Sequence, residues 1–129
     1  MLGENMKRDM ELIRKILIKL EDDTNPKVWK TIEIEGKEQK EISYHIKLLS
    51  EEKMIEARDS GLEPLLLWQA KSLTTQGHDF LDSIRDRSIY TKMKENMGER
   101  LATMPLSLVS SVALELLKEW TMKSFGFKN

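Results

Sequence analysis

The stretch EISYHIKLLSEEKMIEA (residues 41–57) passes from a helical pattern into a strand pattern without a linker. Ile46 and Leu49 fall within roughly 40° of Ile42 around a helix axis, so the three residues share one face. Residues 54–57 then form a short apolar segment of the kind found in strands. The sequence therefore predicts an amphipathic helix over about residues 38–52 that leads directly into a hairpin strand.

Upstream of this stretch the sequence predicts one helix and one strand. Residues 7–22 carry apolar side chains at helical spacing, which form one face: Leu12, Ile13, Ile16, Leu17 and Leu20. The helix is expected to end before Pro26, because the residue that precedes a proline disfavours the helical backbone conformation. Residues 28–35 then alternate, with Ile32 and Ile34 facing the core, which predicts a short strand.

Downstream the sequence predicts the rest of a small sheet. The predicted hairpin has its turn at Ser60-Gly61 and its second strand over residues 65–69. The strand at 28–35 would be the third strand of the sheet. Trp29 and Trp68 flank predicted strands, and we expect both indoles to pack into the core.

Two further helical segments complete the chain. Residues 73–97 predict one helix, kinked at a break near Arg87-Ser88, with Thr74 or Thr75 as its N-cap and a connector after it; division into two helices at the break is the alternative. Residues 105–125 predict a final helix, with Thr103 as its N-cap and Pro105 in its first turn.

The composition describes a soluble globular protein. Of the 129 residues, 40% are hydrophobic and 33% are charged, and none is Cys, which excludes disulfides and thiolate chemistry. No apolar run approaches the ~20 residues of a membrane span, and the first residues lack a signal-peptide pattern. We therefore predict a cytoplasmic protein without membrane contact.

The predicted order of elements is helix, strand, helix, hairpin, helix. That order predicts an α+β, mainly helical, winged-helix-like fold over residues 1–98, to which residues 99–129 add a connector and an amphipathic helix. A usual winged helix has two helices between the first strand and the hairpin. Here the first of them must be missing or reduced to a turn.

Three stretches in order, MKRDMELIRKIL (6–17), EISYHIKLLSEEKMIEA (41–57) and LTTQGHDFLDSIRD (73–86), resemble one family. It is the bacterial and phage group called domain of unknown function 2513. Its members typically carry Gly where Lys53-Met54 stand, and LTWEGH where this chain has LTTQGH. The resemblance implies a winged-helix-like fold and a phage or prophage setting, and it implies no activity.

The exposed side of the 38–52 helix is the candidate DNA-binding surface. Together with the wing it contributes Lys40, Ser43, Tyr44, Lys47, Arg58 and Ser60, which would contact phosphates, sugars and base edges. Residues 1–84 hold 13 Lys/Arg against 17 Asp/Glu, a net charge of −4, whereas residues 85–129 hold 8 against 5, or +3. This acidic balance disfavours DNA, so a solvated structural face is the alternative.

The final helix carries the candidate oligomer or partner interface. Its apolar residues are Val109, Val112, Ala113, Leu114, Leu116, Leu117 and Trp120, with Leu114 lying beyond the main stripe. This face either forms a homodimer seam or packs on the chain's own first helix. Both arrangements stay open at this point.

The sequence predicts no catalytic residues, metal or cofactor. His45 and His78 are the only histidines, and no nucleophile–base pair or set of metal ligands accompanies them. The predicted function is therefore a non-enzymatic binding module, a DNA-binding transcription regulator that acts by occupying double-stranded DNA. The alternative is a protein-binding module, a phage-encoded adaptor or inhibitor of a host or defence protein.

Overall fold

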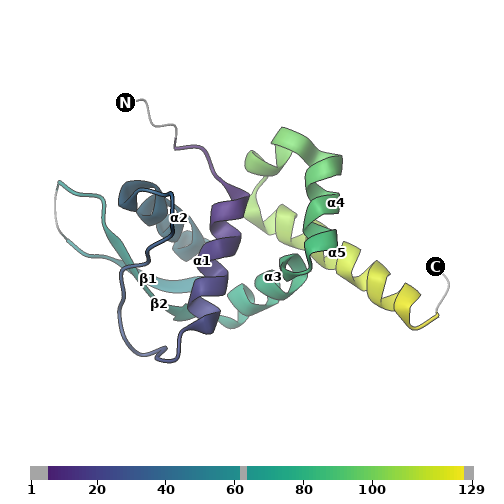
Figure 1. The fold of residues 1–129 in the computed structure, drawn as a ribbon, viewed down its shortest axis with the longest axis horizontal. Coiled ribbons are helices and arrows are strands. Elements are labelled where there is room, and N and C mark those ends of the chain that lie inside the picture. The colour runs from purple at the N-terminus through teal and green to yellow at the C-terminus, as the bar shows by residue number, and fades with distance from the viewer. Residues whose placement is uncertain (1–5, 62–63, 127–129) are drawn as a thin grey trace. The chain divides into compact units, whose positions relative to one another are not determined.

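The computed structural model describes residues 6–61 and 64–126 (Figure 1). The elements are α1 (Met10–Asp22), α2 (Gln39–Glu51), β1 (Ile55–Asp59), β2 (Trp68–Leu73), α3 (Thr75–Arg85), α4 (Arg87–Met97), the 3-10 helix η1 (Gly98–Ala102) and α5 (Leu106–Ser124). This order confirms the mainly helical, winged-helix-like α+β prediction. The chain packs as two compact units that divide between His78 and Asp79. The predicted extent of the winged-helix-like domain, residues 1–98, stays a prediction.

The first unit places α1 and α2 beside the hairpin of β1 and β2 (Figure 1). The apolar stripes read from the sequence are the buried ones: Leu12, Ile13, Ile16 and Leu17 of α1, and Ile42, Ile46 and Leu49 of α2, are each at most 1% exposed. Burying a side chain of this size contributes about 1.5–3 kcal/mol, so these two stripes dominate the stability of the unit.

Asp9 sets the start of α1, three residues later than predicted. Its carboxylate accepts hydrogen bonds from the N–H groups of Glu11 (3.0 Å) and Leu12 (3.2 Å), the pattern of an N-cap. The N–H of Asp9 itself donates to Nε2 of the buried His45 (2.8 Å). His45 Nδ1 must then carry the proton and donate to the carbonyl of Glu41 (2.8 Å). His45 is therefore a structural link between α1 and α2.

The hairpin is antiparallel, and its third strand is reduced to one bridge. Ala57 pairs with Ala70, and a bulge lies between Glu56 and Ala57. Lys30 pairs with Ala70 through both backbone groups (2.9 and 3.0 Å). The predicted strand over residues 28–35 is therefore wrong beyond this residue, although Ile32 is buried as expected.

Two α2 side chains explain why the third strand stops. In a continued ladder Ile32 would face Trp68. Instead the Gln39 amide donates to the carbonyl of Ile32 (2.8 Å), and Ser43 Oγ donates to the Gln39 amide oxygen (3.3 Å). Ser43 Oγ also accepts the N–H of Trp68 (2.9 Å). This Gln39–Ser43 relay bridges the strand edges through side chains and satisfies the groups that a ladder would pair.

The C-terminus of α2 ends in a left-handed residue. Lys53 has φ 60°, and its N–H donates to the carbonyl of Ser50 (2.9 Å). The N–H of Met54 donates to the carbonyl of Leu49 (2.9 Å). These two bonds form a Schellman motif, in which the left-handed position usually holds Gly. The family's Gly, which the resemblance placed at Lys53-Met54, fits this position.

The α3 and α4 segment forms two helices, so the prediction of one kinked helix is wrong. Asp86 breaks it with an extended backbone (ψ 121°) and caps α4 by accepting from the N–H groups of Ser88 and Ile89. The N-cap of α5 is Pro105 rather than Thr103, and no side chain caps it. Within the first unit, Thr74 is the residue whose hydroxyl accepts the N–H of Gly77 (3.0 Å), which confirms one of the two predicted caps.

Candidate nucleic-acid interface

The outer face of the hairpin carries an aromatic residue under two cations. The Arg58 guanidinium lies 4.5 Å from the centroid of the Trp29 ring, and Lys71 Nζ lies 5.2 Å from it. Both separations are within the range of cation–π attraction. Trp29 is half-buried, so it does not belong to the core as the sequence predicted, and Trp68 is half-buried as well.

Hydrogen bonds across three chain segments hold this face in one arrangement. Both Nε and Nη2 of Arg58 donate to the side-chain oxygen of Gln69 (3.1 and 2.9 Å), and the Gln69 amide donates to the Thr31 hydroxyl (3.5 Å). Residues 29, 31, 58, 69 and 71 are called the Trp29 cluster below. Among the described residues, neither Arg58 nor Lys71 forms an ion pair with a carboxylate.

Lys30 fixes the segment that carries Trp29. Its ammonium group donates to the Asp23 carboxylate, to the carbonyl of Asn25 (3.0 Å) and to the carbonyl of Lys71 (2.8 Å). The hydrogen bond from Lys30 holds the pKa of Asp23 below its ordinary value. Since all three ammonium protons are used within the chain, Lys30 acts as an anchor and leaves Arg58 and Lys71 as the cations of the cluster.

The exposed side of α2 is less suited to phosphate than predicted. Lys40 is exposed, but Lys47 lies 3.3 Å from the carboxylate of Glu51 and 6.0 Å from the Tyr44 ring, which is half-buried. Ser43 is 0% exposed because it belongs to the Gln39–Ser43 relay, so its predicted position on the exposed ridge is wrong. The exposed surface of α2 thus carries positive and negative side chains in alternation.

The wing turn provides backbone geometry and a shielded hydroxyl. Gly61 has φ 78° and its N–H donates to the Asp59 carboxylate (2.9 Å), as expected of a glycine in the predicted turn at Ser60-Gly61. The N–H of Ser60 donates to the carbonyl of Leu67 (2.9 Å), and its hydroxyl oxygen is buried. Ser60 therefore does not present its hydroxyl to a ligand, contrary to the prediction.

Comparison with known proteins places the chain in a family. Residues 7–103 match the family model described as "Hypothetical protein (DUF2513)". The chain belongs to the DUF2513 family. An "Uncharacterized protein" of Haemophilus influenzae (strain ATCC 51907 / DSM 11121 / KW20 / Rd) is 34% identical over 116 residues, which cover 88% of this chain and 98% of the relative. No solved structure matches the chain.

Four members of the Trp29 cluster were missed from the sequence of this DUF2513 chain. Arg58 was predicted as a wing contact, whereas Trp29, Thr31, Gln69 and Lys71 come from segments that meet only through pairing. The signal available was the alternation of Trp29 and Thr31 about Lys30, which puts both on the face opposite the core. Without the register of Lys30 with Ala70, their neighbours across the strands are undefined.

The predicted partner interface on α5 is only partly available. Val109 and Ala113 are 0% exposed, so the chain itself covers them, and Val112, Leu116 and Leu117 are half-buried. Leu114 and Trp120 are 55% and 51% exposed. Three more large apolar residues are exposed, Leu108 near the start of α5 and Met122 and Phe125 near its end.

Residues 6–61 and 64–126 contain no group of three or more His, Asp or Glu side chains placed to hold a metal ion. None of their helices has the length and apolar character needed to cross a bilayer.

Proposed function

We propose that the chain is a non-enzymatic module that binds double-stranded DNA through phosphate contacts from the outer face of the hairpin. One observation carries this proposal: Arg58 and Lys71 lie over the Trp29 ring without a carboxylate partner among the described residues. A cation with no internal ion pair is available to a phosphate, and each such contact releases counterions from DNA.

The Trp29 ring prepares the two cations for binding. Its electron-rich face restricts where Arg58 and Lys71 point, so less side-chain entropy is lost when a phosphate arrives. Gln69 adds two hydrogen bonds that orient the guanidinium. The ring is therefore a platform for cations, and these contacts carry no base sequence.

The winged-helix-like arrangement also supports DNA as the ligand, by analogy of fold with function. The exposed Lys40 on α2 is a third candidate cation, while the Lys47–Glu51 pair contributes little. With few phosphate contacts we expect weak binding, strongest at low salt. The protein would act by occupying DNA, with no chemical step.

The test is fluorescence anisotropy of a labelled duplex with wild-type protein and two double variants. Arg58→Glu with Lys71→Glu reverses both cations of the Trp29 cluster, whereas Arg100→Glu with Lys118→Glu makes the same charge change at exposed residues of the second unit. We expect the first variant to lose binding by tenfold or more, roughly 1.4 kcal/mol, and the second to lose much less. Equal losses, or no binding by the wild type at about 50 mM salt, would refute the proposal.

A further inference from the structure

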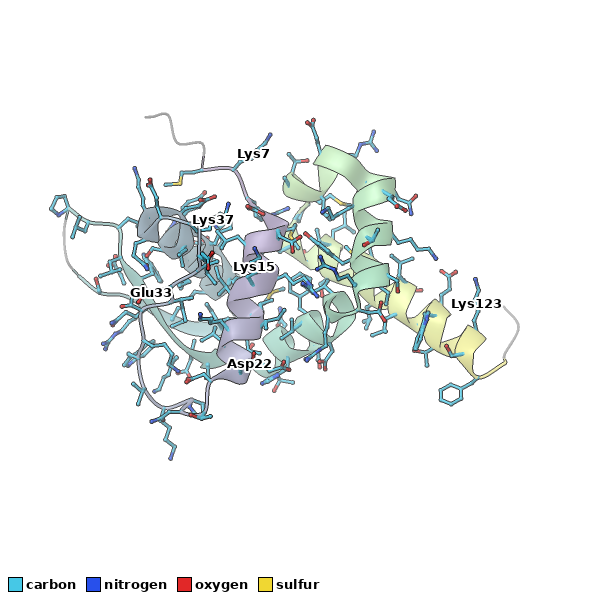
Figure 2. The ribbon with its side chains drawn as sticks, in the orientation of Figure 1. Lys7, Lys15, Asp22, Glu33, Lys37 and Lys123 are labelled. Atoms are coloured by element: carbon cyan, nitrogen blue, oxygen red, sulfur yellow. The ribbon has the colours of Figure 1, made fainter. Side chains whose placement is uncertain are left out.

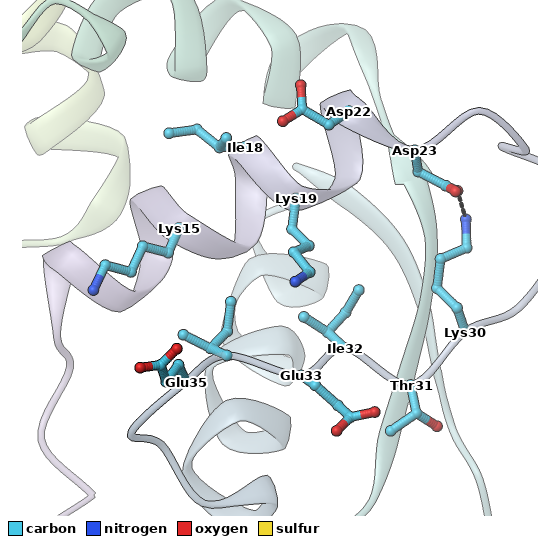
Figure 3. Close-up of a pocket in the computed structure, with 11 residues that line it drawn as sticks. Lys15, Ile18, Lys19, Asp22, Asp23, Lys30, Thr31, Ile32, Glu33 and Glu35 are labelled. Atoms are coloured by element: carbon cyan, nitrogen blue, oxygen red, sulfur yellow. Dashed lines mark hydrogen bonds and ion pairs between the residues drawn. The ribbon is translucent and has the colours of Figure 1, made fainter.

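A groove runs between α1 and residues 30–35, which the sequence predicted to be part of a strand. It has a volume of about 800 Å³ and is lined by Lys15, Ile18, Lys19, Asp22, Asp23 and residues 30–35 (Figure 3). Ile18, Ile32 and Ile34 supply its apolar surface. All of these residues belong to the first unit, and Thr31 is shared with the Trp29 cluster.

The segment beside the groove offers unpaired backbone groups. Lys30 directs both of its backbone groups toward Ala70, so in an extended chain the neighbouring residue directs its own the opposite way. The exposure of Thr31 and Glu33 on either side of the buried Ile32 fits this alternation. Within the described residues, the N–H and C=O groups of Thr31 and Glu33 form no hydrogen bond.

Internal contacts prevent the segment from closing this edge itself. On the inner side the Gln39–Ser43 relay occupies the carbonyl of Ile32. At the far end the N–H of Lys37 donates to the carbonyl of Ile34 (3.1 Å), in a turn where Gly36 has φ 82°. The segment is thus held at both sides while its outer edge, at Thr31 and Glu33, stays free. A free edge of this kind is a template for another strand.

The two walls of the groove carry opposite charges. Lys15 and Lys19 extend from α1, and Glu33 and Glu35 extend from the facing segment (Figure 3). None of these four side chains forms an ion pair with any described residue. An occupant with charges of both signs would meet a complementary wall on each side.

We propose that this groove binds an extended peptide from a partner protein, added as a strand along Thr31 and Glu33. The peptide would alternate apolar residues, which face Ile18, Ile32 and Ile34, with one acidic and one basic residue. The acidic side chain would pair with Lys15 or Lys19, and the basic one with Glu33 or Glu35. Backbone pairing supplies affinity and the alternate side chains supply specificity, as in other strand-addition complexes.

Peptide pools test the proposal by NMR with the isotope-labelled full chain. Each pool consists of heptapeptides with valine at the odd positions, and the even positions hold acidic residues only, basic residues only, or both. We expect the mixed pool to shift the amide resonances of Thr31 and Glu33 more than either single-sign pool. If no pool shifts them, or all pools shift them equally, the proposal is wrong.

Backbone methylation of a binding peptide tests the pairing itself. Alternate amides of a strand point to opposite edges, so two peptides methylated on alternate sets of amides differ only in which edge is blocked. We expect one isomer to lose affinity about tenfold or more and the other to lose little. Equal affinities for the two isomers would overturn strand addition.

Matched variants of the protein complete the test. Glu33→Pro removes the free N–H without breaking any hydrogen bond within the described chain, and Glu33→Gln keeps that N–H while removing the charge. We expect the proline variant to lose binding about tenfold and the glutamine variant only a few-fold. Thermal unfolding shows whether each variant is folded. Lys15→Glu with Lys19→Glu tests the opposite wall of the groove and leaves the backbone groups of residues 31 and 33 unchanged. Retained binding in the folded proline variant would contradict the proposal.

Discussion

Within residues 6–61 and 64–78, side chains fix irregular segments by bonding to distant backbone groups, whereas the helix caps and turns described for the second unit use short-range bonds. In the first unit, His45 and Ser43 reach backbone atoms 36 and 25 residues away. In the second, Asp86 and Ser111 bond within four residues of themselves. The first unit therefore adds long-range polar contacts to its apolar core, whereas these hydrogen bonds of the second unit stay local.

The two units also differ in the kinds of side chain that they expose. The side-chain hydrogen bonds of the first unit leave the two cations of the Trp29 cluster without a carboxylate partner among the described residues. The second unit exposes large apolar side chains, among them Trp120 beside a small pocket of about 100 Å³ lined by Ser88, Ile89 and Lys92. Lys123 lies at the same end of α5 (Figure 2).

The largest effect is expected at Gly77, where the backbone of α3 approaches that of Met54. A Cβ added at Gly77 would lie 1.9 Å from the carbonyl oxygen of Met54, a contact that only backbone movement can relieve. Gly77→Ala should therefore reduce the free energy of unfolding by at least about 3 kcal/mol, measured by urea unfolding.

Gly36→Ala is the matched control for steric cost. Gly36 has φ 82° and open space around it, so alanine there meets only the left-handed backbone penalty of about 1 kcal/mol. If the Gly77 variant were as stable as the Gly36 variant, the close approach to Met54 would be wrong.

A comparison of two serines tests whether single polar atoms matter more in the first unit. Ser43→Ala removes the acceptor of the Trp68 N–H in a part-buried contact, at a cost of about 1–2 kcal/mol. Ser111→Ala removes an exposed bond to the carbonyl of Ser107 and should change stability by no more than about 0.5 kcal/mol. Similar urea midpoints for the two variants would remove the contrast between the units.

Asp9 gives a pH-dependent version of the same test. Burial alone would raise the pKa of Asp9, but hydrogen bonds from Lys37 (3.0 Å) and from the N–H groups of Leu12 and Glu11 outweigh it and lower the pKa below 3.8. Figure 2 shows Lys37 near α1. Because the pKa is lowered on folding, the ionised group stabilises the protein above about pH 4, and this stabilisation is lost as pH falls through the folded pKa.

Asp9→Asn should therefore lose about 1 kcal/mol or less at neutral pH, since Asn still caps α1 and the ion pair with Lys37 is partly exposed. The difference from wild type should shrink as pH falls below about 4 and through the folded pKa of Asp9, as measured by unfolding at several pH values. A difference that persists at low pH would mean that the charge of Asp9 is not its source.

The smallest expected effect is a gain. Lys53→Gly relieves a left-handed residue at the end of α2, and the benefit of about 1 kcal/mol is partly offset by the greater entropy of glycine in the unfolded chain. We expect a net stabilisation of about 0.5 kcal/mol by urea unfolding. Destabilisation would show that the Lys53 side chain contributes contacts of its own.

The sequence predicted the helices well because their apolar stripes are local. The stripes of α1 and α2 and the turn glycine Gly61 all follow from short-range patterns. The reduced third strand did not, because the Gln39–Ser43 relay forms only when α2 packs beside the hairpin. The sequence placed a break near Arg87-Ser88 but kept one kinked helix, because the cap that Asp86 forms on α4 depends on its extended backbone.

Candidate site residues were predicted less well, for the same reason. Exposure of Ser43 was inferred from its angle on an isolated helix, and the hairpin covers that angle. Trp29, Arg58 and Lys71 lie in three separate segments, so their contact depends on the register and on the bulge after Glu56. Single-sequence patterns contain neither.

The dependence of DNA affinity on salt tests the central claim most directly. Each phosphate contact contributes about 0.9 to the slope of log affinity against log salt, so neutralising Arg58 and Lys71 together as Arg58→Gln with Lys71→Gln should reduce the slope by about 1.8. An unchanged slope in a folded variant would show that neither cation contacts DNA, and the assignment of the Trp29 cluster as the interface would be wrong.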